Sequence, residues 1–111
     1  MIELARGAMV LFAERGDYTS KPRPGVIVQR DVTLSDAPSI TLCGVTTHAI
    51  GANAARIALV PSAENGLLKP CYVMIDKVAS IRRYRIRERV GMLHIEDMRQ
   101  IDIALRRWLD L

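Results

Sequence analysis

Long hydrophobic runs are missing from this chain of 111 residues. No stretch is apolar over enough residues to span a bilayer, and the first apolar run, 8–13, ends at Glu14, too soon for a signal peptide. We therefore expect a cytoplasmic location and no membrane partner.

Cysteine is almost as scarce. Cys43 and Cys71 are the two cysteines, and they lie far apart in apolar, strand-like stretches. Because a disulfide framework or a metal site needs more ligands at closer spacing, both thiols are expected to be reduced, buried and inert.

Motifs for metals and cofactors are absent as well. His48 and His94 stand alone, without carboxylate or cysteine neighbours at ligand spacing. The sequence has no glycine-rich phosphate loop and no serine on a nucleophile elbow. We expect neither a metal ion nor a cofactor.

Basic residues are in excess, giving a formal net charge of +4, and thirteen of the sixteen are arginines. Five of these form what we call the arginine cluster: Arg82, Arg83, Arg85, Arg87 and Arg89. Such a cluster attracts nucleic acid or an acidic protein segment. A solvated, arginine-rich turn is an equal alternative at this point.

The hydrophobic pattern predicts one domain, 1–111, that is mainly β with a C-terminal α-helix. Short apolar runs bounded by turn residues predict strands at 8–13, 24–29, 39–46, 55–60 and 71–78. Such a succession favours an antiparallel sheet or small barrel. From Ile95 to Leu109, apolar residues recur at steps of three and four and predict a helix. Gly91 precedes it as a breaker, and Trp108 is expected in the core.

The segment 21–29 places Arg23 between Pro22 and Pro24, ahead of an apolar strand. Each proline fixes its own φ, and Arg23, preceding Pro24, is restricted to extended geometry. A guanidinium on so stiff a backbone suits a fixed anion such as phosphate. An edge strand with an exposed arginine explains these residues equally well.

Other polar groups stand at the ends of predicted strands. Thr46, Thr47 and His48 follow the third strand, while Asp76 and Lys77 lie within or end the fifth. Each has a structural explanation, since threonine favours strands and turns and a charged pair suits a solvated strand end.

Taken in order, several segments resemble the MazF/PemK family of ribosome-independent toxins. They are Arg6-Gly7, 21–29, Val45-Thr46-Thr47, 66–70, 73–78 and 90–93. The resemblance covers nearly the whole chain and implies an SH3-like small antiparallel barrel, similar to MazF and CcdB, that forms a homodimer. It also implies metal-independent, sequence-specific cleavage of single-stranded RNA and neutralisation by a cognate antitoxin.

Carried over by position, Arg23 and Thr46 match the family's catalytic arginine and threonine. Asp76 and Lys77 match positions that contact RNA bases, and Ser20 and Lys21 lie in a loop that closes over the substrate. Thr47 and His48 are further candidates for substrate binding. Three positions depart from the family pattern: Ala8 where aspartate is usual, Lys77 where glutamine is common, and His48 where an amide or hydroxyl is frequent.

The chemistry of RNA cleavage is compatible with these roles. Negative charge builds on the non-bridging phosphate oxygens, where a fixed arginine and a hydroxyl donor stabilise it. Arginine is a poor base, so His48 is a candidate for proton transfer if the strand stays extended from Thr46 and both side chains share a face. A loop histidine that at most contacts RNA is the simpler reading. Aromatic residues are scarce, and Tyr18 and Tyr84 are the available stacking platforms for bases. Base readout should therefore rely on hydrogen bonds more than on stacking.

Two other functions compete with RNA cleavage. A DNA gyrase poison of the CcdB type would dock C-terminal residues, here 108–111, on gyrase; it ranks lower because Trp108 fits the apolar helix face. A non-catalytic SH3-like RNA-binding module is the third reading.

Overall fold

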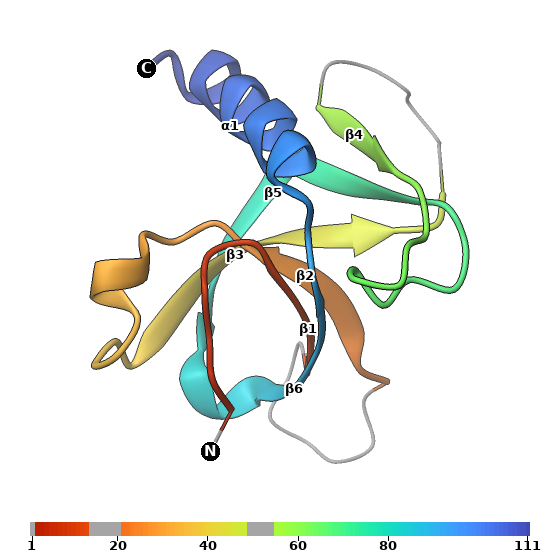
Figure 1. The fold of residues 1–111 in the computed structure, drawn as a ribbon. Helices are drawn as coiled ribbons and strands as arrows, with labels where there is room; N and C mark the ends of the chain where they lie inside the picture. The colour runs from red at the N-terminus through yellow and green to blue at the C-terminus, as the bar shows by residue number, and fades with distance from the viewer. Residues whose placement is uncertain (1, 14–20, 49–54) are drawn as a thin grey trace.

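The computed structural model describes residues 2–13, 21–48 and 55–111, which form a strongly bent antiparallel sheet and a C-terminal helix (Figure 1). The six strands run in the order β4-β5-β3-β2-β1-β6. The elements are β1 (Ala8–Phe12), β2 (Arg23–Ile27), η1 (Asp31–Thr33), β3 (Ser39–Thr46), β4 (Arg56–Leu59), β5 (Cys71–Arg82), η2 (Arg83–Arg85), β6 (Ile86–Met92) and α1 (Ile95–Leu109). The prediction of a mainly β fold with an antiparallel sheet and a C-terminal helix is confirmed. None of the helices within these ranges is long and apolar enough to cross a membrane.

Five strands occur where the hydrophobic pattern predicts them, but the arginine cluster is not a simple turn. β5 continues to Arg82, and after the single turn of η2 the chain forms β6, an edge strand paired with β1. Arg87, Glu88 and Arg89 are all exposed, so β6 lacks the alternation that marks a strand. Its pairing with β1, such as Val10 opposite Arg89, overrides that local signal.

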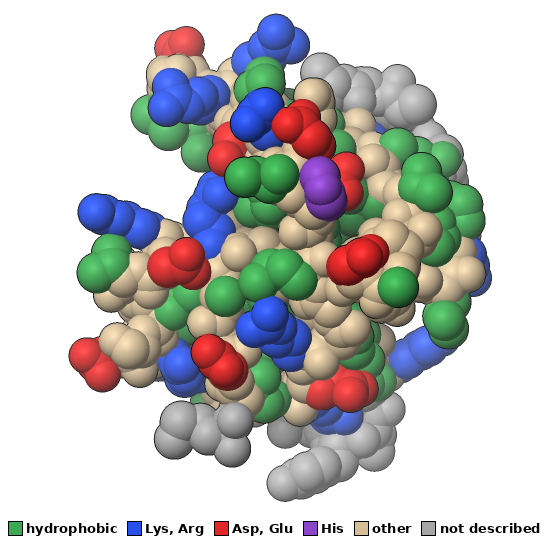
Figure 2. All heavy atoms as spheres, in the orientation of Figure 1, with side chains coloured by type: hydrophobic (Ala, Val, Ile, Leu, Met, Phe, Trp, Pro, Cys, Tyr) green, Lys and Arg blue, Asp and Glu red, His purple; other side chains and the backbone are tan. Residues whose placement is uncertain are grey.

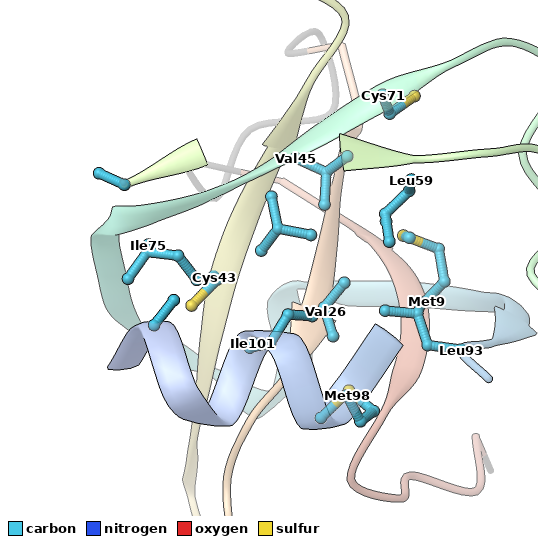
Figure 3. Close-up of a cluster of buried hydrophobic side chains, with 13 residues drawn as sticks. Met9, Val26, Cys43, Val45, Leu59, Cys71, Ile75, Leu93, Met98 and Ile101 are labelled. Atoms are coloured by element: carbon cyan, nitrogen blue, oxygen red, sulfur yellow. The ribbon is translucent and has the colours of Figure 1, made fainter. Parts of the chain in front are cut away.

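The helix α1 covers one face of the sheet, as Figure 3 shows. Met98, Ile101 and Ala104 are its buried residues. They pack in a cluster with Met9, Val26, Cys43, Val45, Val73 and Ile75 from the strands. Both cysteines are buried and free, as expected.

Trp108 does not belong to this core, contrary to the prediction. Its side chain is 55% exposed, and neighbouring Leu109 is 52% exposed. The apolar spacing of α1 continues to its end, but the last turn lies beyond the sheet that the earlier turns cover (Figure 1). Helical periodicity shows which residues share a face, not where the opposing surface ends.

A second apolar cluster fills the other side of the bent sheet. Its members include Phe12, Ile27, Leu34, Leu42, Ile81 and Ile86, and Ile2 and Leu4 from the N-terminal segment pack against it. The sheet is therefore apolar on both faces, which explains why several strands read as continuous hydrophobic runs.

The turn after β4 joins the two edges of the sheet. Buried Asn65 organises this turn: its Oδ1 accepts hydrogen bonds from the backbone N–H groups of Ser62 and Leu67, both at 3.0 Å, and its Nδ2 donates to the Val60 carbonyl at 2.9 Å. The Met92 N–H on β6 donates to the Glu64 carbonyl at 2.7 Å.

Two glycines permit this approach of backbone to backbone. Gly66 has a positive φ of 71°, and a Cβ there would lie 2.2 Å from the Val90 carbonyl oxygen. A Cβ on Gly91 would lie 2.3 Å from the Asn65 carbonyl carbon. Gly91 is therefore not a breaker before α1 but a strand residue at a tight crossing.

Candidate active-site cleft

A bulge in β5 shapes the candidate site. Cys43 pairs with Val78 and Val45 pairs with Val73, so the four residues 74–77 of β5 lie opposite Gly44 of β3. A Cβ on Gly44 would lie 2.9 Å from the Met74 methyl carbon. The absence of a side chain at Gly44 thus makes room for Met74.

The bulge also changes which face of the sheet successive β5 residues occupy. Val73 and Ile75 point into the cluster beneath α1. From the last residue of the bulge onward, the odd-numbered residues Lys77, Ala79 and Ile81 line a cleft on the opposite side. A regular strand would keep all odd-numbered residues on one face, so the bulge is what brings Lys77 to the cleft.

The cleft has a volume of about 440 Å³ and is built from four strands. Its apolar walls come from Phe12, Pro24, Leu42, Val45, Met74, Ala79 and Ile81, with Gly44 between them. Its polar lining consists of Arg23, Thr46 and Lys77. Two cations and a hydroxyl group in a largely apolar cleft form a suitable environment for an anion.

Arg23 and Thr46 come from neighbouring strands. Arg23 begins β2, where it pairs with Phe12 of β1. β2 and β3 pair with Gly25 opposite Gly44, and the same register continued by two residues places Arg23 across from Thr46. Directly opposed residues of antiparallel strands share a face. The anion-site reading of 21–29 is thereby favoured over a bare edge strand.

His48 does not share this face through an extended strand. β3 ends at Thr46, whose Oγ accepts a hydrogen bond from the His48 backbone N–H at 3.2 Å. This local turn removes the geometric condition on which the proton-transfer role of His48 rested. Thr47 and His48 are exposed just past the strand end.

Among the residues that the structure describes, no other predicted site residue lines the cleft. Lys21 is exposed ahead of β2, whereas Ser20 and Tyr18 lie outside the described residues. Asp76 is not among the residues that line the cleft. Its Oδ1 instead accepts a hydrogen bond from Nη1 of Arg56, the first residue of β4.

Next to Gly44 in the sequence, Cys43 lies fully buried on the α1 side of β3. Burial raises the pKa of its thiol to about 11, and the nearby Asp76 carboxylate adds to the rise. The thiol is therefore protonated near neutral pH and is a poor nucleophile. Within the described ranges, no three His, Cys, Asp or Glu side chains are grouped so as to hold a metal ion.

Sequence reasoning missed Met74 and Gly44, which line this cleft, and Arg56, which pairs with Met74 beside it. Met74 has the pattern of an ordinary strand residue, and neither Gly44 nor Arg56 was singled out. A glycine inside a predicted strand is a known sign of a bulge or close approach, so Gly44 carried a usable signal. The residues of the Arg56–Asp76 contact are 20 positions apart in the sequence, so no local pattern predicts the contact.

The cleft of this bent antiparallel sheet presents an arginine on a restricted backbone, a threonine and a lysine. Such a set of side chains is suited to bind phosphate-like anions. Comparison with known proteins is consistent with a protein of this anion-binding class. The family described as PemK-like, MazF-like toxin of type II toxin-antitoxin system matches residues 6–109. The chain belongs to this PemK/MazF toxin family.

Individual relatives cover the same length. A protein of Mycolicibacterium smegmatis named "Probable endoribonuclease MazF" is 38% identical over 102 residues, which span 92% of this chain and 93% of the relative. A solved endoribonuclease in complex with its cognate antitoxin, from Mycobacterial species, has a TM-score of 0.78 at 21% identity and covers 100% of this chain and 97% of that chain. A chain in the crystal structure of MazE-MazF from Deinococcus radiodurans has a TM-score of 0.79 at 17% identity, with 97% of each chain covered. These two structural likenesses concern the fold.

Proposed function

We propose that this chain is the toxin of a type II toxin-antitoxin pair and an endoribonuclease that cleaves single-stranded RNA, without a metal ion, at short sequences. The observation that carries the proposal is the convergence of Arg23 and Thr46, from adjacent strands, on one cleft. The relative named as an endoribonuclease, at 38% identity over nearly the full length, supports it.

In the proposed reaction the 2′-oxygen of a ribose forms a bond to the adjacent phosphorus, and the bond from phosphorus to the 5′-oxygen breaks. The 2′-hydroxyl releases its proton to water, and the departing 5′-oxygen takes one up. Negative charge builds on the non-bridging oxygens during this exchange. Arg23 keeps its positive charge at neutral pH and stabilises those oxygens, while the Thr46 hydroxyl holds the scissile phosphate.

The prolines beside Arg23 have a role in this scheme. A charged group that is already held in place stabilises the transition state without first reorienting. The free energy of that reorientation is then not added to the barrier of the reaction. Pro24 fixes the backbone next to Arg23 and also lines the cleft. Lys77, Lys21, Thr47 and His48 would bind the flanking nucleotides.

Incubation of the purified protein with a long RNA in EDTA tests the proposal. We expect cleavage at defined sites, and Arg23→Ala should lower kcat about 10²- to 10³-fold, as for loss of one oxyanion donor. Arg99→Ala is a matched control, because Arg99 pairs with Glu96 on the exposed side of α1. RNA that stays intact with the wild-type protein would refute the enzymatic role.

A gyrase poison stays a second candidate, because one observation favours it. Trp108 is 55% exposed and Leu111 is 84% exposed, so the C-terminal residues are available for docking and the burial of Trp108 no longer counts against this mode. Intact RNA together with stalled gyrase would support it. Intact RNA that is nevertheless bound would instead indicate a non-catalytic RNA-binding module.

Three further features belong to the proposal. A homodimer would lengthen the short groove that one sheet offers to RNA. A cognate antitoxin would bind and neutralise the toxin, and the solved mycobacterial endoribonuclease is likewise in complex with its cognate antitoxin. The cytoplasm, where RNA and antitoxin meet, would be the site of action.

A further inference from the structure

The ion pair between Arg56 and Asp76 lies beside the cleft. Arg56 stands directly opposite Met74 in the pairing of β4 with β5, and Met74 lines the cleft. Asp76 is two residues further along β5, so it is the diagonal neighbour of Arg56, within reach of a long side chain. The Ile75 N–H donates to the Ala55 carbonyl at 2.8 Å, which holds β4 against the bulge at this point.

The environment of this pair differs from that of an ordinary surface ion pair. The Arg56 side chain is 17% exposed and the Asp76 side chain 30%. Arg99 and Glu96 on α1, by comparison, are 62% and 58% exposed. Screening by water is weaker where side chains are covered, so removal of one partner leaves a charge with more effect on its surroundings.

An unpaired carboxylate at this place would oppose an anionic ligand. Asp76 neighbours Lys77, which lines the same cleft as Arg23 and Thr46. A phosphodiester chain entering the cleft brings a negative charge for every nucleotide, and a bare carboxylate close to its path repels it. Arg56 cancels that charge and fixes one of the two Asp76 oxygens.

We propose that Arg56 is a positioning residue for RNA binding: it masks the charge of Asp76 and orients the carboxylate so that its other oxygen accepts a hydrogen bond from a nucleobase N–H group. This inference rests on the proposed function, since it presupposes that RNA occupies the cleft. Bases with donors on an exposed edge, such as the amino group of cytosine or adenine, fit an acceptor of this kind.

Arg56→Ala tests the masking role. KM for a short single-stranded RNA should rise about tenfold, the size expected for one unmasked unit charge near a phosphate. The kcat should stay within about twofold, because Arg23 and Thr46 are unchanged. Arg56→Lys keeps the positive charge and should stay close to wild type in KM.

The double variant Arg56→Ala with Asp76→Asn separates this role from direct phosphate binding by Arg56. If Arg56 acts through Asp76, removing the carboxylate charge restores KM to within about threefold of Asp76→Asn alone. Site mapping on a randomised RNA tests the hydrogen bond to the base. In Asp76→Asn the amide oxygen pairs with Arg56 and the NH2 group, a donor, faces the base, so the base preference at one position should change.

Several results would overturn the inference. A KM that stays high in the double variant would make Arg56 a direct phosphate contact, and an unchanged KM in Arg56→Ala would remove any role. Arg99→Ala, which deletes an equally charged ion-pair arginine on the other face, should leave KM unchanged. If Arg56→Ala unfolds, Arg56→Gln retains most of the aliphatic stem and serves instead. Failure of wild-type protein to cleave RNA would refute the proposed function, which is a distinct outcome.

Discussion

Cys43 links the sheet interior to the charge beside the cleft. Its thiol belongs to the core beneath α1, yet the Asp76 carboxylate contributes to its raised pKa. The ordinary pKa is 9.0, and the folded protein raises it to about 11, mainly through burial. A thiol that resists ionisation in the folded state gives the protein a stability that depends on pH.

The direction of that dependence is fixed by the raised pKa. Below pH 9 both the folded and the unfolded chain keep the Cys43 proton, and the contribution is complete. As the pH rises from 9 toward 11, the unfolded chain loses the proton and the folded chain retains it, so unfolding becomes easier. At a pH of about 10.5 the loss is on the order of 2 kcal/mol.

Urea unfolding at pH 8 and at about pH 10.5, in wild type and Cys43→Ala, measures this effect. Cys43→Ala is less stable at pH 8 because it leaves a small cavity, but it should lose less stability between the two pH values. Cys71 also has a raised pKa from burial, and it is present in both proteins, so its effect cancels. Equal losses in the two proteins would contradict the assignment.

At the scale of elements, the crossing of the Asn65–Gly66 turn with β6 has little space to spare. A Cβ on Gly91 would meet backbone atoms of Glu64 and Asn65 at 2.3 to 2.6 Å. Backbone cannot move aside as a side-chain end can, so Gly91→Ala should destabilise the protein by about 3 kcal/mol or more. Chemical denaturation measures the change.

Gly44→Ala is the matched control for Gly91→Ala. Its Cβ would meet the methyl end of Met74 at 2.9 Å, and that flexible side chain can turn away toward the cleft. We expect a cost of about 1 kcal/mol in stability. RNA cleavage should fall, because the displaced Met74 narrows the cleft. Equal destabilisation by the two substitutions would show that backbone crowding does not distinguish these sites.

The elements also show how far local sequence patterns reach. The strand at 39–46 and the helix from Ile95 to Leu109 are observed with the predicted bounds, since both have clear hydrophobic periods. β6 was missed because successive charged residues conceal its alternation. The bulge was missed because it arises from the pairing of two strands, and neither strand alone records its register with the other.

The residues of the candidate site also differ in how far the sequence alone predicts them. Arg23 could be singled out, since its prolines act locally. Thr46 and Lys77 needed a family resemblance, because a threonine or lysine near a strand end is common in any sheet. Arg56 needed the folded chain, because its contact with Asp76 depends on how β4 lies against β5.

At the scale of the whole molecule, the two sides of the sheet differ in what covers them. One side packs against α1 and the other opens as the cleft. On the face drawn in Figure 2, basic and acidic side chains are intermixed, so charge there is not segregated into a patch of one sign. The arginines of β6 instead lie along one edge of the sheet.

Charge reversal tests whether this edge binds a partner. Arg87→Glu combined with Arg89→Glu should weaken binding either of RNA or of an acidic segment of the proposed antitoxin, and should make that binding less dependent on salt. For RNA the slope of log K against log salt should fall by about 1 for each phosphate that an arginine no longer neutralises. Titration over a range of salt concentrations measures it. If neither affinity responds, these arginines only solvate the edge strand.

The bulge at Gly44 has a consequence for how such a protein diversifies. Residues 74–77 stand outside the regular pairing of β5 with β3. Met74 still pairs with β4 and Ile75 is buried in the core, so the exposed Asp76 and Lys77 are the two that the sheet constrains least. Selection can exchange side chains there, one position at a time, while the strands on either side keep their partners. If the proposed function holds, exchanges at these two exposed positions offer a route to a different RNA preference that leaves the fold unchanged.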